Sequence, residues 1–163
     1  MVMQPSNRRP FDIRLPLGNV KFSVRVAVLC TRGATLLTNT EPGIGFHYLP
    51  GGAVTTGEDS ATAAAREWTE ETGLPPGPLR LVGVVESFFG PPDRRQHEIG
   101  FYYHTPAPLE LPDRPFAVQD NPGVTCHWLP LNATESTPVY PLVIRDLLDV
   151  PAGEIRHIVN HEG

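Results

Sequence analysis

Apolar and polar residues alternate along several short stretches of the chain, and this period of two is typical of strands that bury one face. The alternation is clear in 20–33, whose second half becomes continuously apolar. Arg32 and Gly33 predict a hairpin turn from this strand into a second one at 34–40. The other predicted strands are 46–50, 79–90, 97–105, 124–131 and 154–159. Strands are therefore expected to form most of the structure.

A helical period replaces this alternation in 60–72, where small and apolar residues recur every three or four positions. Asp59 or Ser60 is the predicted N-cap, and Gly73 stands at the C-terminal stop position. The predicted packing face consists of Ala61, Ala64, Ala65, Trp68 and Thr72. Small alanines on this face would let the helix lie close to a sheet.

The rest of the chain completes a single domain. A second amphipathic helix is predicted over 139–150, with Pro141 in its first turn. Three prolines mark 1–16 as an N-terminal arm, whereas the proline-rich 106–123 is expected to be an ordered surface loop. Strands interrupted by two helices predict a mixed α/β fold, in which helices pack on the faces of one sheet. Residues 17–163 are expected to form this single domain.

Composition and charge narrow the class of protein. The chain has 163 residues, a formal net charge of −5 and 40% hydrophobic residues, which fits a folded domain and excludes broad nucleic-acid binding through net charge. It contains no membrane-length apolar run and no signal-peptide core, so a cytoplasmic location without membrane contact is expected. Cys30 and Cys126 lie in apolar stretches and are predicted to be buried free thiols. Assembly as a homodimer is left open.

The predicted helix carries three glutamates on one face. Glu67, Glu70 and Glu71 share that face at spacings of three and four residues, where like charges repel, and they lie at the negative end of the helix dipole. A hard divalent cation such as Mg²⁺, which prefers carboxylate oxygens, would offset both costs. The alternative is a solvated acidic face on which Arg66 pairs with Glu70.

The surrounding residues form a longer pattern that resembles the complete Nudix box over 52–74. The pattern reads Gly52, five residues, Glu58, seven residues, Arg66, Glu67, apolar Trp68, one residue, Glu70, Glu71, one residue, Gly73 and apolar Leu74. The resemblance extends over 17–160 through the order and length of the flanking segments. It implies an α/β/α sandwich with a central mixed sheet, which agrees with the fold class predicted from periodicity.

The resemblance also implies a reaction and roles for the box residues. The expected protein is a hydrolase that uses Mg²⁺ or Mn²⁺ to activate water and cleaves the diphosphate linkage of a small-molecule nucleoside diphosphate derivative. The residues that match metal-ligand positions are Glu67, Glu70, Glu71 and the backbone carbonyl of Gly51. Arg66 matches the residue that orients these carboxylates, and Glu58 matches a supporting glutamate. Gly52 and Gly73 match conformational glycines.

Candidate residues outside the box come from the strand pair around the polar loop 91–96. Strand alternation puts Glu98, Gly100 and Tyr102 on one face, and Glu98 is a candidate general base or further metal ligand. Glu67 is the other candidate for the base. Arg94 and Arg95 are candidate phosphate ligands, and Glu86 is a candidate substrate ligand; each has a solvated or structural role as its alternative.

The substrate is left open between a nucleotide, a nucleotide sugar and a dinucleotide. Some Nudix subfamilies carry a marker proline or tyrosine where this chain has Phe89, Gly90 and Pro91. Pro91 comes slightly late for the proline marker, and no tyrosine is present, so neither marker is matched cleanly. An alternative function is a non-catalytic Nudix-fold nucleotide sensor, against which the intact acidic box argues.

Overall fold

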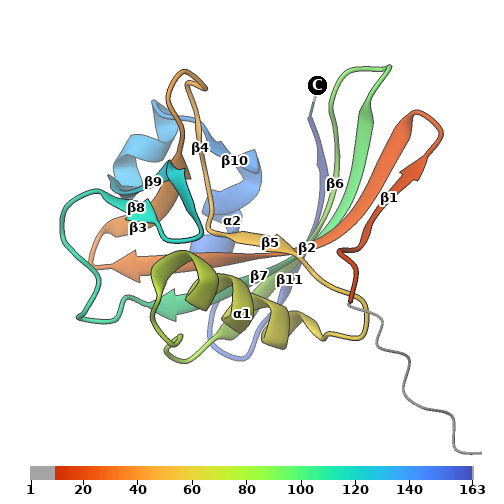
Figure 1. Cartoon of the computed structure of the whole chain (residues 1–163). Helices are drawn as coiled ribbons and strands as arrows, with labels where there is room; N and C mark the ends of the chain where they lie inside the picture. The colour runs from red at the N-terminus through yellow and green to blue at the C-terminus, as the bar shows by residue number, and fades with distance from the viewer. Residues whose placement is uncertain (1–9, 163) are drawn as a thin grey trace, which may run out of the picture.

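The computed structural model describes residues 10–162 (Figure 1). Its eleven strands belong to one sheet with the main order β10-β4-β3-β2-β7-β6-β11. The strands are β1 (Arg14–Leu17), β2 (Val20–Arg32), β3 (Thr35–Thr40), β4 (His47–Tyr48), β5 (Gly51–Ala53), β6 (Arg80–Phe89), β7 (Arg95–Pro106), β8 (Phe116–Val118), β9 (Asn121–Pro130), β10 (Val139–Tyr140) and β11 (Arg156–His161). Parallel pairs β2–β7 and β6–β11 stand beside the antiparallel pair β6–β7, so the predicted mixed sheet is confirmed.

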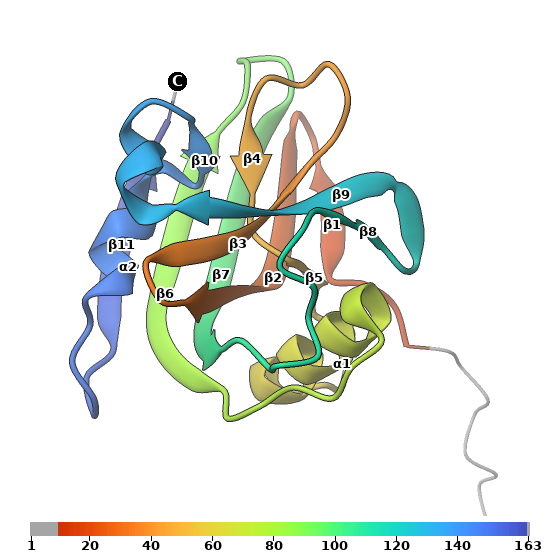
Figure 2. The same ribbon diagram turned by 90° about the vertical axis from the view of Figure 1, so that its left-hand side faces the viewer.

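Helices cover both faces of this sheet, as the predicted sandwich requires. The helices are α1 (Ser60–Thr72), α2 (Arg145–Leu148) and the 3-10 helices η1 (Leu131–Glu135) and η2 (Leu142–Ile144). One buried cluster joins α1 to the sheet through Ala63, Ala64 and Trp68, and a second joins η2 and α2 through Ile144 and Leu147. In Figure 1, α2 lies on the upper side of β2 and α1 on its lower side, and Figure 2 shows the strands of the sheet spread out from β6 to β2.

Strand alternation decides which side chains face the second cluster. In β2, Arg25 and Ala27 point to this face, while Val26 and Val28 pack on the α1 side. The register pairs Arg25 with Gly100 and Ala27 with Tyr102. The central strands thus present polar and aromatic groups toward one concave region and bury β-branched residues behind it.

Helix α1 has the boundaries predicted from the sequence. The Asp59 side chain accepts a hydrogen bond from the Thr62 amide at 2.8 Å, and Gly73 adopts a left-handed conformation with φ 75°. The buried face differs from the prediction, because Ala63 is buried and Ala61 is exposed. This rotation places Glu71 in the buried face of the helix.

Two segments differ from their predictions. The predicted helix 139–150 is divided into β10, η2 and α2, because Pro141 follows an extended residue pair and has an extended backbone itself. The predicted arm 1–16 ends earlier than expected, because β1 pairs with β2 from Arg14 onward. Residues 1–9 lie outside the described part of the chain. The loop 106–123 is ordered and contains β8.

Other features concern the cysteines and possible membrane spans. Cys30 and Cys126 are buried and free, as predicted. No helix within residues 10–162 is long and apolar enough to cross a membrane.

Candidate active site

Arg66 holds together two glutamates of α1, Glu67 and Glu70, and Glu58 in the loop before the helix. The Arg66 guanidinium donates through Nε and Nη2 to the two carboxylate oxygens of Glu58 at 2.8 and 2.9 Å. Its Nη1 donates to Glu67 at 3.0 Å and to Glu70 at 3.3 Å. The arginine therefore contacts three carboxylates, and its planar fork makes a bidentate pair with Glu58.

This arrangement fixes the loop before α1 as well as the helix. Arg66 Nη2 donates to the Ala53 carbonyl at 3.0 Å, and Glu58 accepts from the Thr55 amide at 3.1 Å. The hydrogen bonds from Arg66 are the main cause that lowers the pKa of Glu58 to about 2. The ion pair between Glu58 and Arg66 therefore links β5 to the helix.

Glu71 lies deeper than the other acidic residues and has different partners. Its side chain accepts from the Gly51 amide at 2.9 Å, with the Asn39 amide nitrogen at 3.4 Å, and only 8% of the residue is exposed. Burial, followed by the negative charges of Glu67 and Asp120, raises its pKa to about 8. Burial also raises the pKa of Glu67. Two neighbouring carboxylates therefore resist ionisation together.

Two glycines allow the close packing around these acids. A Cβ atom on Gly52 would collide with the carboxylate of Glu67, so β5 can approach the helix only because this side chain is absent. A Cβ atom on Gly73 would meet the side chain of Gln119, whose backbone amide donates to the Glu71 carbonyl at 2.9 Å. The second contact attaches the β8–β9 turn, which carries Asp120, to the end of the helix.

Arg66 is the cation that Glu58, Glu67 and Glu70 contact, whereas Glu71 contacts the Gly51 amide and Asn39. Within residues 10–162, no three or more His, Cys, Asp or Glu side chains are arranged closely enough to hold a metal ion. The predicted ligands Glu67, Glu70 and Glu71 nevertheless share one region with Gly51, whose amide contacts Glu71. The structure brings the predicted group together without showing a metal site.

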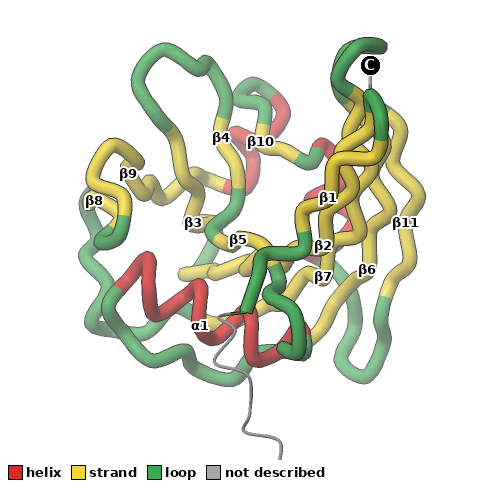
Figure 3. Tube along the Cα trace, turned by 45° about the vertical axis from the view of Figure 1, so that its right-hand side comes forward, coloured by secondary structure: helices red, strands yellow, loops and turns green. Residues whose placement is uncertain are grey.

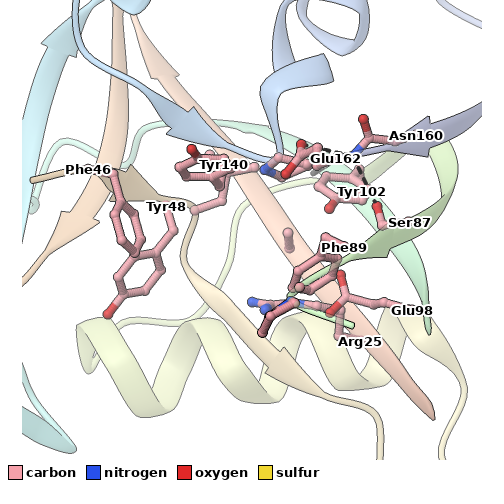
Figure 4. Close-up of a pocket in the computed structure, with 15 residues that line it drawn as sticks. Arg25, Phe46, Tyr48, Ser87, Phe89, Glu98, Tyr102, Tyr140, Asn160 and Glu162 are labelled. Atoms are coloured by element: carbon pink, nitrogen blue, oxygen red, sulfur yellow. Dashed lines mark hydrogen bonds between the residues drawn. The ribbon is translucent and has the colours of Figure 1, made fainter. Parts of the chain in front are cut away.

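A cavity of about 670 Å³ opens on the sheet face next to this cluster (Figure 4). Aromatic residues form much of its wall: Phe46, Tyr48, Phe89, Tyr102 and Tyr140. The cavity is connected to the acidic cluster electrostatically, because Arg25 lines it and also acts on the charge of Glu71. The two regions are therefore neighbouring parts of one candidate site.

Two charged side chains in the cavity wall face each other without a protein partner. Arg25 on β2 and Glu98 on β7 make no hydrogen bond or ion pair with any residue in the described range 10–162. Burial raises the pKa of Glu98, and the nearby Arg25 charge partly counteracts this. Figure 4 shows both side chains on the side of the cavity nearest α1. Groups of this kind are available to a ligand.

The opposite wall contains a fixed polar network from the C-terminal strand. Asn160 donates to Glu162 at 2.9 Å and to the Ser87 hydroxyl at 3.5 Å. Glu162 also accepts from the backbone amide of Leu142 at 3.0 Å. These contacts join β11 and β6 to η2 and orient polar groups at the cavity wall.

The remaining predicted site residues lie elsewhere. Glu86 points to the other face of β6, where its carboxylate lies 2.7 Å from the ring nitrogen Nε2 of His157, and it does not line the cavity. Arg94 and Arg95 line a separate groove at the tips of two hairpins. Of the predicted residues outside the box, only Glu98 reaches the aromatic cavity.

Sequence analysis missed several residues of the site. Asn39, Arg25 and Asp120 lie on different strands or turns, far from the box along the chain. Only the alternation in β2, which places Arg25 among apolar residues, was a signal available in the sequence. The approach of Asp120 depends on the docking of the β8–β9 turn, for which the sequence contains no short-range pattern.

Comparison with known proteins agrees with this geometry. The family model described as NUDIX domain matches residues 21–147. No curated protein matches the sequence significantly.

Among solved structures, the chain is similar to the Mutator MutT protein from Bacillus halodurans, with 15% identity and a TM-score of 0.67 over 85% of this chain and 89% of that one. The MutT NUDIX hydrolase from Burkholderia pseudomallei has 23% identity and a TM-score of 0.63, covering 80% and 98%. A NUDIX hydrolase from Nitrosomonas europaea has 22% identity and a TM-score of 0.55, covering 82% and 90%. These structures show a shared fold.

The family model covers most of the chain, and the box glutamates, their arginine and both close-approach glycines occupy one region of the structure. The protein therefore belongs to the Nudix family and is a hydrolase of phosphoric anhydride bonds.

Proposed function

We propose that this protein is a cytoplasmic, Mg²⁺- or Mn²⁺-dependent pyrophosphohydrolase that cleaves the diphosphate linkage of a small nucleoside diphosphate derivative. The observation that carries the proposal is the pair of mutually repelling carboxylates, Glu67 and Glu71, beside an aromatic cavity. A divalent cation would relieve the repulsion, and an aromatic cavity suits a nucleobase.

The chemistry of the acidic residues fits such a cation. Glu67, Glu70 and Glu71 supply hard oxygen donors, and the Gly51 carbonyl is a further candidate ligand. Glu71 is already oriented by the Gly51 amide, and Glu67 by Arg66. Bound Mg²⁺ would neutralise phosphate oxygens and lower the pKa of the attacking water. In this proposal Arg66 keeps its bond to Glu58 and holds the carboxylates in position.

The nucleoside part is assigned to the aromatic cavity. Figure 4 shows Phe46, Tyr48 and Tyr140 on one side and Phe89 on another. The rings of Phe46 and Tyr140 make an edge contact at 5.2 Å, so this wall has a defined geometry. A base that enters the cavity can stack on these rings, which contributes about 1–3 kcal/mol per base.

Arg25 is assigned to the phosphates. Its guanidinium has no partner in the described chain and acts electrostatically on both Glu71 and Glu98. It lines the cavity and its charge also acts on the acidic cluster, so we assign it to the diphosphate of a nucleotide that extends from the cavity toward that cluster. A guanidinium at this position can bind phosphate oxygens bidentately.

Glu98 is the proposed general base. Burial raises its pKa, which brings a carboxylate closer to the range where it can accept a proton at neutral pH. Glu67 is the alternative, since burial raises its pKa too and it lies within the cluster.

The test of the proposal is hydrolysis of a nucleotide panel with Mg²⁺ or Mn²⁺, read by phosphate release. We expect turnover of at least one member, loss of turnover in EDTA, and a fall of about 10²-fold or more in kcat for Glu70→Gln. A wild-type protein that binds nucleotides without hydrolysing any would instead support the sensor function. Unchanged turnover in Glu70→Gln would overturn the role of the acidic cluster.

A separate variant tests the base. Glu98→Gln keeps the shape of the side chain but cannot accept the proton, so kcat is expected to fall by more than about tenfold, which is about 1.4 kcal/mol in barrier. A smaller fall, together with a larger one for Glu67→Gln, would move the assignment to Glu67.

A further inference from the structure

A second groove, of about 420 Å³, lies between the tips of two hairpins. One tip joins β1 to β2 and the other joins β6 to β7; Figure 3 shows them side by side. The Asn19 side chain donates to the Pro92 carbonyl at 3.1 Å, and the Arg95 amide donates to the Asn19 carbonyl at 3.0 Å. The two tips are therefore held together, and the groove between them is a fixed feature.

The groove is strongly basic although the chain is acidic. Four of the 13 basic residues of a chain with net charge −5 line it: Arg14, Lys21, Arg94 and Arg95. Asp93 is the acidic residue in the lining, and Asp12 lies 3.9 Å from Arg14 outside it. A groove lined by one sign of charge raises the local concentration of anions and favours their binding.

The basic side chains are free to take a ligand. Lys21 and Arg94 make no hydrogen bond or ion pair with the described residues. Arg95 donates through Nη1 to the Gly90 carbonyl at 2.6 Å, which fixes the guanidinium. The other guanidinium nitrogens remain available to a ligand. Gly90 also lines the aromatic cavity, so Arg95 connects the two hollows.

A row of cations joins the groove to the candidate active site. Lys21 and Arg25 point to the same face of β2, four residues or about 13 Å apart. Arg14 pairs with Ser23 and shares this face. All three positive charges act on Glu98 in the cavity wall. A chain of phosphates could therefore extend from Arg25 toward the hairpin tips.

We propose that the groove lined by Arg14, Lys21, Arg94 and Arg95 binds phosphate groups, and that its ligand is the distal phosphate end of an extended substrate. The groove assignment stands on its own charges and geometry, while the identity of its ligand rests on the proposed function. Arg94 and Arg95 keep the phosphate-binding role expected from the sequence, at a subsite separate from the aromatic cavity.

The groove is tested by calorimetric titration of metal-free protein with inorganic tripolyphosphate. The double variant Lys21→Ala/Arg94→Ala should weaken binding by about tenfold or more, and added salt should weaken wild-type binding. Arg114→Ala is the matched control, because this exposed arginine lies outside the groove and has no partner in the described chain. Equal affinities in wild type and double variant, or equal losses in the double variant and the control, would overturn the site. Melting temperatures check the fold.

The source of the phosphate is tested with a matched pair of substrates. The hydrolysed nucleoside triphosphate that binds best is compared with the corresponding 5′-tetraphosphate. The double variant should raise KM for the tetraphosphate about fivefold more than for the triphosphate. An equal change for both would assign the groove to a free anion instead. If the wild type hydrolyses no nucleotide, the proposed function fails, and the tripolyphosphate titration still decides whether the groove binds phosphate.

Discussion

The acidic cluster of α1 and the aromatic cavity lie next to each other but are built differently. The cluster comes from residues 51–71, and its charged groups are tied by hydrogen bonds to Arg66 and to backbone amides. The cavity is assembled from β2, β4, β6, β7, β10 and β11, and two of its charged groups, Arg25 and Glu98, have no partner in the described residues. The charged groups of the acidic cluster are already held by hydrogen bonds, whereas two charged groups of the cavity remain available to bind a ligand.

This difference assigns bond cleavage to the acidic cluster and substrate selection to the aromatic cavity. A cluster with fixed hydrogen bonds can hold its carboxylates in one geometry, which is what a metal-assisted cleavage needs. A cavity whose wall comes from distant segments can change its lining without disturbing the cluster. We therefore expect damage to the cluster to lower kcat or stability, and damage to the cavity to raise KM.

The largest effect is expected for Gly52→Ala. The new Cβ atom would collide with the carboxylate of Glu67 and move it, and a displacement of about 1 Å in a catalytic group can cost about 10²-fold in rate. Steady-state kinetics should show the loss mainly in kcat. Gly123→Ala is the matched control, since its nearest atom would be the Asn121 side-chain oxygen at 3.6 Å. Full activity in Gly52→Ala would show that the position of Glu67 is not critical.

A stability loss of about 2 kcal/mol is expected for Arg66→Ala. The substitution removes the bidentate bond to Glu58 and leaves the neighbouring glutamates without their cation. Urea unfolding of metal-free protein measures this, with Arg114→Ala as a control that should change stability by less than about 0.5 kcal/mol. Equal stability of both variants would mean that the charged network contributes nothing to the fold.

The cavity is expected to respond through binding. Phe46→Ala removes one ring of the aromatic wall and should raise KM by about tenfold with little change in kcat, because stacking acts on ground state and transition state alike. Phe11→Ala is the control, since Phe11 is 71% exposed and does not line the cavity. A fall in kcat with unchanged KM would contradict the separation between cluster and cavity.

The smallest effect is a pH dependence of stability that originates in Glu71. Burial raises its pKa from 4.5 to about 8. Between these values the folded protein binds a proton that the unfolded chain releases, so the free energy of unfolding of the metal-free protein decreases as the pH rises. The slope expected from this one group is at most about 1.4 kcal/mol per pH unit. Glu71→Gln should remove that part of the slope in urea unfolding with EDTA; identical slopes would exclude Glu71 as its source.

Much of the cluster could be predicted from the sequence, because helix periodicity fixes which residues share a face. The boundaries of α1 and the grouping of Glu67, Glu70 and Glu71 follow from local spacing. The burial of Glu71 could not be predicted, since it depends on how β5 and Asn39 approach the helix. Local spacing places Arg66 beside Glu70, but the bidentate bond from Arg66 to Glu58 emerges only in three dimensions.

The cavity could be predicted much less well. Strand alternation placed Glu98, Gly100 and Tyr102 on one face, which the structure shows, and it gave no information on which strands would stand opposite. Glu86 is a candidate substrate ligand in the sequence, but its position on β6 turns it toward His157 on the other face. Long-range pairing, which no local pattern encodes, decides these positions.

The central claim is that the acidic residues of α1 form the protein side of a divalent-metal site. Titration of the protein with Mn²⁺, followed by electron paramagnetic resonance, tests it directly. The wild type should bind Mn²⁺, Glu71→Gln should bind it at least about tenfold more weakly, and Glu110→Gln, in an exposed loop without a partner among the described residues, should bind it like the wild type. Equal Mn²⁺ affinity in wild type and Glu71→Gln would contradict the account.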